Sequence, residues 1–414
     1  MELKKVAIIV RVMMLLAAVV LTVGCSDDDG ADRRDVVTVE LAPYASGYTE
    51  KEPVNIGTRA GDPSSPVWAP TDYYLYEDLE SASGIYISNV NSAIGAFFTS
   101  GTNHIVRKFR YERARRKWLI DEPLDEGGDN RYYLYGIVPY NAANVNITPL
   151  DGAYSNGAVM TMDGLTSVMN QDPCIVVGAK DGRKDGDSNP VPTVNPMKLG
   201  DFNCYFKVSS SVEQNSPNYL FLLFDHLYAA LRFRFRVDAQ YAGLRSIRLK
   251  KLEMEAYQDP ECTRPVKENV RTTVTLRANT TGVSPIVGSI EFTPYGSESS
   301  ESVHSALIYE DSEGKLIPTG DNYTDNLGFV PKINSYFVLR STYDVYDTNT
   351  EHNPKGNLIR KECVAENKID PIKLFQTESL DRGNLYTLRL TIKPTYLYML
   401  SEPDLDNPTV VVSE

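Results

Sequence analysis

The chain has 414 residues, a formal net charge of −13 and a pI of about 5.0. This acidic balance argues against nucleic acid as a partner, because binding to phosphates needs a basic surface. The length beyond the first 24 residues is enough for two or three ordinary domains, each with its own hydrophobic core.

The amino terminus has the pattern of a secretory signal peptide over residues 1–24. Basic residues precede an apolar stretch at 12–23 that is too short for the ~20 residues of a membrane-spanning helix. Cys25 follows the small residue Gly24, an arrangement that resembles the lipobox of bacterial lipoproteins, although Thr22 replaces the usual leucine. The resemblance implies a lipid on the Cys25 thiol and cleavage just before it. The alternative is a plain secretory signal with an incidental cysteine.

An acidic cluster follows this cysteine directly, formed by Ser26, Asp27, Asp28 and Asp29. It resembles the export signal of surface-exposed lipoproteins in Bacteroidetes. The alternative is a solvated tether, because a run of carboxylates cannot pack into a core. The two interpretations are compatible with each other.

Strand periodicity dominates the rest of the chain. Apolar and polar residues alternate in five segments, as in half-buried β-strands: 36–41, 231–237, 246–256, 270–276 and 386–393. In 246–256 the alternation slips at Lys250 and Lys251, and a β-bulge is the usual way to absorb such a slip. Short helices are expected only near 92–98 and 225–231. The fold class is therefore all-β, with sandwiches as the expected architecture.

The polar, proline-containing segment at 213–218 predicts a boundary between two domains. We expect an N-terminal β-sandwich domain at 66–215 and a C-terminal one at 216–414. Residues 25–65 precede both domains.

The residues of enzyme chemistry are not arranged as a site. No histidine lies at metal-ligand spacing with another histidine or a cysteine; the four are His104, His226, His304 and His352. The acidic turn at 185–189 is followed by Pro190 where an EF-hand needs glycine. We therefore expect no enzyme activity, cofactor or metal, and we expect His226 to be a hydrogen-bonded core residue.

Four cysteines remain beyond Cys25, and they are Cys174, Cys204, Cys262 and Cys363. An even count in an exported chain permits two disulfides in any of three connectivities. No tight spacing supports a particular pairing, so the pattern favours buried free thiols for most of them.

Several segments, in this order, resemble the fimbrillin family of Bacteroidetes. Besides the lipoprotein start, they are TRA at 58–60, YGIVPY at 135–140, LFDHLYAALRF at 223–233 and the segment 390–408. The resemblance implies two transthyretin-like β-sandwich domains in tandem and transport as an outer-membrane lipoprotein. It also implies cleavage after an arginine by a trypsin-like protease, loss of the first strand, and insertion of a strand from another fimbrial subunit. Such pili on the cell surface support adhesion, through a receptor, and biofilm formation.

The bond between Arg59 and Ala60 is the expected processing site, since it lies in a small, polar segment of the kind that proteases prefer. Residues 25–65 would then be a lipidated acidic tether that carries the removable strand 36–41. The alternative is an ordinary exposed linker arginine. A tip or minor subunit is favoured over a stalk subunit because the strand-like tail at 409–412 is short for a donor.

Two other functions stay open. A pilus anchor would keep its lipid and its first strand in the outer membrane. A glycan-binding surface lipoprotein would need exposed aromatic platforms, but Trp68 and Trp118 are the only tryptophans. Binding of the uncleaved protein to glycans would favour the latter.

Overall fold

The computed structural model describes fifteen stretches of the chain, and every structural statement below refers to them. They are residues 39–46, 49–51, 73–75, 93–112, 117–122, 131–141, 144–184, 190–192, 202–207, 218–278, 286–295, 304–319, 322–333, 336–395 and 404–413.

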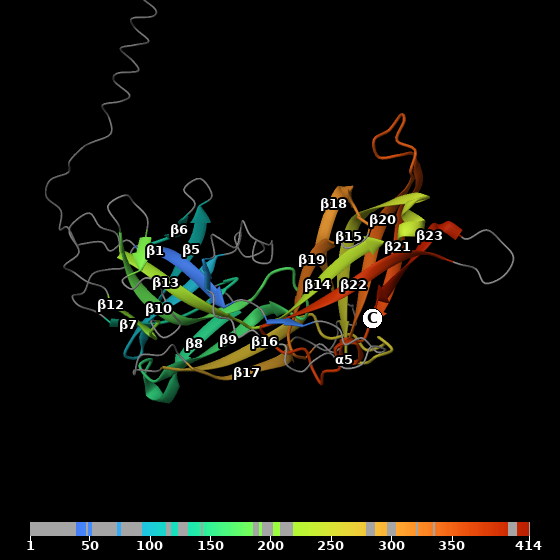
Figure 1. Cartoon of the computed structure of the whole chain (residues 1–414). Helices are drawn as coiled ribbons and strands as arrows, with labels where there is room; N and C mark the ends of the chain where they lie inside the picture. Colours follow the sequence, from blue (N-terminus) through green and yellow to red (C-terminus); the bar gives the residue numbers. More distant parts are fainter. Residues whose placement is uncertain are drawn as a thin grey trace, which may run out of the picture. The chain divides into compact units, whose positions relative to one another are not determined.

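The first sheet contains ten strands (Figure 1). They are β1 (Val39–Ser46), β3 (Tyr73–Leu75), β4 (Ile94–Ser100), β5 (Asn103–Glu112), β6 (Lys117–Ile120), β7 (Arg131–Val138), β10 (Cys174–Lys184), β11 (Pro190–Pro192), β12 (Tyr205–Lys207) and β13 (Asn218–His226). Their order is β11-β10-β13-β1-β6-β5-β4-β7-β12, with β3 paired to β1. Because β10 also pairs with β7, seven strands form a closed ring of ladders in which β1 lies between β13 and β6.

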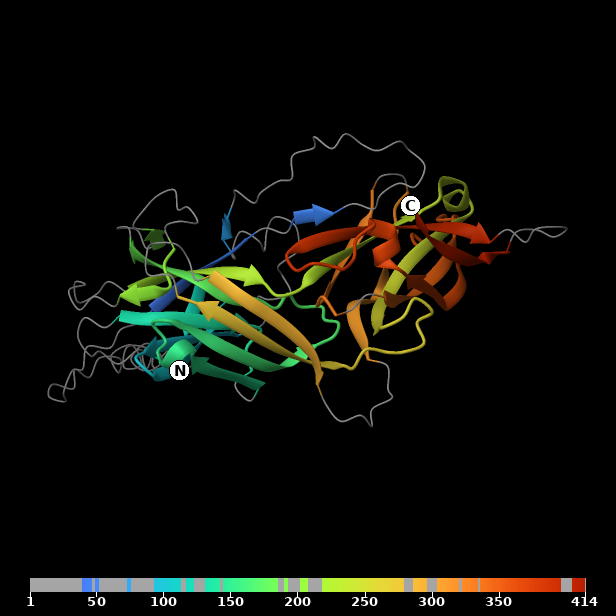
Figure 2. The ribbon, with the colours of Figure 1, turned by 90° about the horizontal axis from the view of Figure 1, so that it is seen from below.

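A second sheet packs against this ring, and Figure 2 shows its strands running side by side. It consists of β8 (Val145–Pro149), β9 (Gly157–Thr166), β16 (Asn269–Arg277) and β17 (Ile286–Tyr295), in the order β17-β16-β9-β8. A short 3-10 turn, η2 (Leu150–Gly152), follows β8. Alternate residues of the ring strands share one core, and the residues between them share another with β8, β9 and β16.

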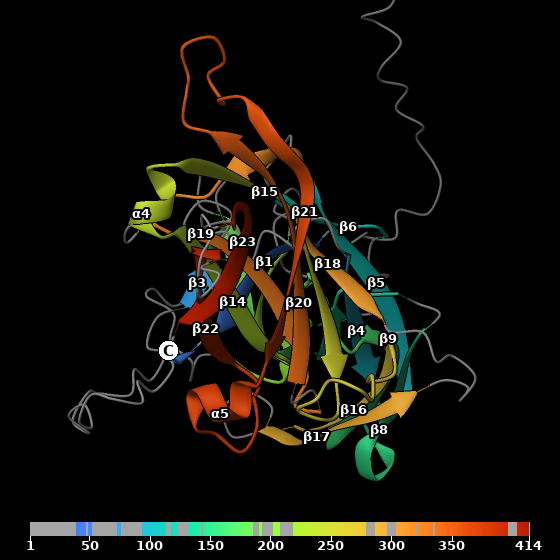
Figure 3. The ribbon, with the colours of Figure 1, turned by 90° about the vertical axis from the view of Figure 1, so that its right-hand side faces the viewer.

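The third and fourth sheets form two layers around a third core (Figure 3). The third contains β2 (Thr49–Lys51), β14 (Ala229–Val237), β19 (Thr324–Val330), β22 (Asn384–Thr395) and β23 (Asp404–Ser413). The fourth contains β15 (Arg245–Tyr257), β18 (Ser305–Leu316), β20 (Tyr336–Asp347) and β21 (Leu358–Ile369), and two short helices lie at α4 (Ala239–Ala242) and α5 (Pro371–Phe375). In the third sheet β22 pairs with β14 on one side and with β2 and β23 on the other.

The all-β class is confirmed, and the strands expected from alternation at 231–237, 246–256, 270–276 and 386–393 are present as β14, β15, β16 and β22. In β14, Leu231, Phe233 and Phe235 are fully buried while Arg234 between them is partly exposed, as the alternation predicts. The first expected strand, 36–41, begins at Val39 within the described residues and extends to Ser46.

The β-bulge expected in β15 is also confirmed. The register of β15 shifts between Leu249 and Lys251 in its ladders with both β18 and β20. The extra residue, Lys250, points its ammonium group at the carboxylates of Asp344 and Glu362, at 3.7 and 3.6 Å. Apolar residues on both sides of the bulge therefore reach the same core.

The two expected helices are wrong. Residues 94–98 belong to β4, and residues 225–231 form the end of β13, a bend and the start of β14. Both segments are buried on both faces: in β4, Phe98 contributes to one core and Phe97 to another. A short continuous apolar run has no alternation, so its pattern does not distinguish a helix from a doubly buried strand.

The carboxyl-terminal strand is longer than the sequence suggested. β23 spans ten residues and pairs with β22, where the tail at 409–412 was expected alone. Pro408 lies at the register shift in this ladder, and on the described chain β23 pairs with no second strand. An edge strand tolerates a proline at such a place, so Pro408 does not end the strand.

The ladders cross the expected domain boundary. β13, which follows residue 216, pairs with β10 and β1, and β16 pairs with β9. The division into 66–215 and 216–414 stays a prediction, and the sheets described here are not separated at that residue.

Two single-residue deletions in β15 test the position of the bulge. Deleting Lys250 should leave a regular strand with Leu249 and Leu252 still on the buried face, so the chain should fold. The loss should be ~1–3 kcal/mol, because Asp344 is only 5% exposed and loses an ionic partner. Deleting Glu253 instead moves Met254, which is fully buried, to the opposite face and should prevent folding. Thermal unfolding followed by circular dichroism measures both, and equal losses would contradict the assigned bulge.

Candidate functional site

The pairing of β1 is the feature of the fold that bears most directly on function. β1 runs parallel to β13 over seven registered pairs, from Val39 opposite Asn218 to Ala45 opposite Phe224. Its other edge pairs antiparallel with β6 over two residues and with β3 over three. The strand is therefore held by backbone ladders on both sides, in the interior of the ten-stranded sheet.

The core beside this position includes buried residues of β4, β7, β10 and β13. Leu220, Leu222 and Phe224 of β13 are fully buried, and they pack with residues of β4, β7 and β10. If β1 left, the backbone groups of β13 that face β1 within residues 218–224 would lose their partners beside this apolar cluster. Unpaired strand edges next to apolar surface are a template for another strand.

A second, shorter ladder continues the same segment. β2 pairs parallel with the start of β22, with Thr49 opposite Asn384 and Lys51 opposite Tyr386. Only two residues separate β1 from β2. Residues 39–51 thus contribute a strand to the first sheet and another to the third.

Side-chain and backbone hydrogen bonds join the two partner strands where the segment passes from one to the other. Arg382 donates from Nη1 to Oδ2 of Asp225 at 2.7 Å and to the carbonyl oxygen of His226 at 3.0 Å. The amide of Gly383 donates to the carbonyl of Tyr228 at 3.0 Å. The end of β13 and the start of β22 are therefore bonded to each other, and they form one continuous track for residues 39–51.

The residues that the sequence nominated for processing lie outside the described residues. These are the lipidation site Cys25, the acidic cluster Ser26, Asp27, Asp28 and Asp29, and the cleavage site Arg59–Ala60. They stay predictions. The described chain does show that strands β1 and β2 both precede Arg59, so a cut there would separate both from the rest of the protein.

The sequence did not predict that β13 and β22 are the strands that pair with residues 39–51. The run at 219–224 is apolar throughout, which is typical of a strand buried on both faces. That pattern could have indicated a strand inside a sheet. It carries no information about the identity or direction of its neighbours.

A buried polar cluster lies beside the end of β13. His226 shares a hydrogen bond with Oδ2 of Asp172, from its Nδ1 at 2.8 Å, and the Cys174 sulfur is 3.5 Å from the same nitrogen. Each of the three side chains is at most 1% exposed. Burial, reinforced by the Asp172 carboxylate, raises the pKa of the Cys174 thiol well above its ordinary value. The expectation of a hydrogen-bonded core histidine is confirmed.

The same three groups are close enough to offer ligand atoms to a metal ion. A structural zinc site takes four protein ligands, and this cluster offers three among the described residues. The hydrogen bonds already account for burying these groups, because they pair the polar atoms with each other. The four cysteines on the described chain are not in disulfides: Cys174 and Cys204 are buried, and Cys262 and Cys363 are partly buried.

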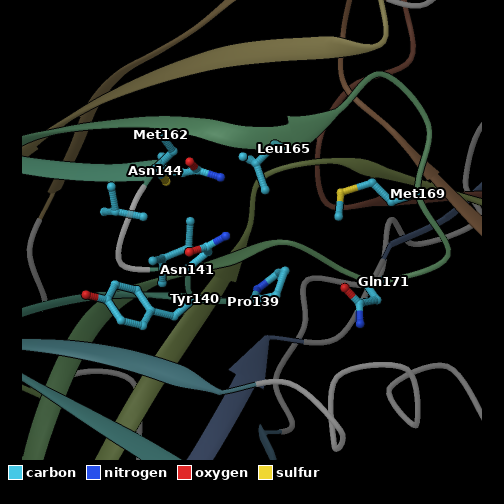
Figure 4. A pocket seen from close by; sticks show the side chains of 11 residues that line it. Pro139, Tyr140, Asn141, Asn144, Met162, Leu165, Met169 and Gln171 are labelled. Atoms are coloured by element: carbon cyan, nitrogen blue, oxygen red, sulfur yellow. The ribbon is translucent and has the colours of Figure 1, made fainter. Parts of the chain in front are cut away.

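A pocket of about 200 Å³ lies at the end of β7, beside β8 and β9 (Figure 4). Leu165 and Met169 lie on one side, and Pro139 and Gln171 lie on the other. Among the described residues that line it, none is charged, and the polar side chains are amides and one tyrosine hydroxyl. Such a lining suits a small neutral group rather than an ion.

No helix among the described residues is long and apolar enough to cross a membrane.

Comparison with known proteins gave structural likenesses only. No protein-family model matches the chain, and no curated protein matches it. A crystal structure from Bacteroides fragilis NCTC 9343, provisionally named a cell adhesion protein, covers 91% of this chain and 97% of its own, with 10% identity and a TM-score of 0.36. A fimbrial protein from Bacteroides vulgatus ATCC 8482 covers 91% and 98%, with 11% identity and a TM-score of 0.30. At these values the likenesses carry no conclusion about this chain.

Proposed function

We propose that this protein is a structural subunit of a surface fimbrium, assembled by strand exchange after its amino-terminal segment is removed. The observation that carries the proposal is the position of β1, an interior strand that is paired on both edges and lies upstream of an Arg-Ala bond. The fimbrillin resemblance of the sequence supplies the context. The neighbours named above have names of the same kind, but the proposal stands on the pairing in this chain.

Before processing, the segment acts as an internal plug. β1 occupies the slot between β13 and β6, so no strand edge of β13 is open, and the protein stays a monomer. Cleavage after Arg59 would separate residues 39–51 from the folded part and would also cut the link to Cys25. One cut would thus release the subunit from its lipid and open the slot to a strand of a neighbouring fimbrial subunit.

The chain supports a subunit role without fixing the position in the pilus. A tip subunit needs only the slot, whereas a stalk subunit also needs a strand to donate. β23 has ten residues, so the tail is long enough to be a donor strand. Tip, stalk and anchor therefore differ in processing and in the use of β23, and the strand pairing is compatible with each.

Processing at Arg59 is tested by Arg59→Ala. The variant should remain in the outer membrane at full length and be absent from sheared pili, because the plug stays in its slot. Arg264→Ala is a matched control, since the Arg264 side chain is 68% exposed within the described fold. Immunoblots of sheared pili and of membranes measure the distribution. Normal entry of Arg59→Ala protein into pili, or pili that still contain residues 39–51, would contradict the proposal and favour the anchor role.

Anchoring and surface display are proposed to depend on the start of the mature chain. Cys25→Ala should lose incorporation of labelled palmitate, while Cys262→Ala should keep it. Palmitate label retained in Cys25→Ala would contradict lipidation at Cys25.

Replacing Asp27, Asp28 and Asp29 with Ala should leave the lipid in place but hide the protein from protease added to intact cells. Unchanged access of the protease in the aspartate variant would contradict a role of the acidic cluster in surface export and leave it as a tether.

A further inference from the structure

The slot occupied by β1 accepts a strand in either direction. β1 is parallel to β13 on one side and antiparallel to β6 and β3 on the other. The two walls of the slot therefore run in opposite directions. Any strand that enters makes a parallel ladder with one wall and an antiparallel ladder with the other, so the backbone groups of both walls can be paired in both directions.

The two directions differ in whether the long ladder, the one with β13, is parallel or antiparallel. In the intact chain the long ladder, seven pairs with β13, is the parallel one. The ladder with β22 is also parallel, over three pairs, while the antiparallel ladders comprise two pairs with β6 and three with β3. Parallel pairing is slightly less stable per residue than antiparallel pairing. The covalent chain thus holds its own segment in the weaker arrangement.

We infer that the strand which replaces residues 39–51 runs in the opposite direction, antiparallel to both β13 and β22. Reversal would make the ten pairs with β13 and β22 antiparallel and would leave the five pairs with β6 and β3 parallel. This inference rests on the proposed strand exchange and specifies the partner. The partner is an extended strand of a neighbouring subunit that runs in the direction opposite to β1.

The structure also sets the reach of that partner. The hydrogen bonds from Arg382 to Asp225 and His226 place the start of β22 at the end of β13. A reversed strand would therefore meet β22 first, near Tyr386, and then continue along β13 toward Asn218. To pair along both, it needs a length comparable to residues 39–51. Alternate apolar residues would let one of its faces cover Leu220 and Leu222.

Reversal would make the exchange proceed in one direction. In the intact chain the removed segment occupies the parallel arrangement along β13. The incoming strand gains the antiparallel ladder along β13, so the assembled state is the more stable one. Processing would then convert a plugged monomer into an acceptor whose assembly is favourable without an external energy source.

Photo-crosslinking in assembled pili tests the direction of the donor strand, whichever subunit donates it. Tyr219 and Phe224 are each replaced by p-benzoylphenylalanine, because both positions already carry an aromatic ring. They pair with Glu40 and Ala45 in the intact chain. In pili from cells that express either variant, mass spectrometry identifies the neighbour's residue attached to each probe. We expect the probe at 219 to reach a residue that is later in the donor sequence than the one reached from 224.

The unprocessed chain calibrates the readout. With Arg59→Ala added, the probe at 219 should attach near Glu40 and the probe at 224 near Ala45, which is the parallel order. The same order in the donor strand would overturn the reversal while leaving strand exchange intact. Pili that contain the protein but give no crosslink to a neighbour from either position would instead contradict the exchange itself.

Discussion

The backbone ladder between β1 and β13 is the interaction on which the described fold depends. Six consecutive residues of β13, 219–224, have β1 on one edge and β10 on the other, and the fully buried side chains of β13 contribute to the cores on both of its faces. β1 is the only strand of the seven-strand ring that precedes the proposed cleavage site. The integrity of the ring and the accessibility of its core are therefore controlled by one short peptide segment near the amino terminus.

Under the proposed processing, this arrangement would link cleavage of the amino-terminal segment to the pairing within a sheet. An interior strand cannot simply be absent, because its neighbours would then expose unpaired amides and carbonyls beside apolar residues. A protein that loses such a strand must take another or aggregate. The same segment extends to β22, and Arg382 bonds to the end of β13, so the proposed cut would affect both the first sheet and the third.

Local sequence patterns predicted the features that depend on the burial of one face of a strand. The alternation in 231–237 identified β14, and the slip at Lys250 identified the bulge, because burial of one face fixes the phase of a strand. The runs at 92–98 and 225–231 misled because strands buried on both faces lack alternation. The length of β23 was underestimated because an edge strand can include Pro408.

Partners distant in sequence could not be predicted. His226 was expected to be hydrogen-bonded, but its partner Asp172 is 54 residues away, and no spacing rule connects the two. For the same reason the parallel pairing of Val39 with Asn218 was not foreseen. A strand pattern specifies which face is buried, whereas neighbour and direction follow from the packing of the whole chain. The predicted processing residues Cys25 and Arg59 rest on sequence context alone and lie outside the described residues.

Amide hydrogen exchange along β13 tests the central claim most directly. In the intact chain, the amides that face β1 within residues 218–224 should exchange slowly, because β1 holds them in a ladder. After cleavage and removal of the segment they should exchange rapidly, and in assembled pili they should again be slow. Amides of β20, which pairs with β15 and β21, should stay slow throughout and serve as the internal reference. Slow exchange at 218–224 that persists in the processed monomer would show that β1 is not the plug of an acceptor slot.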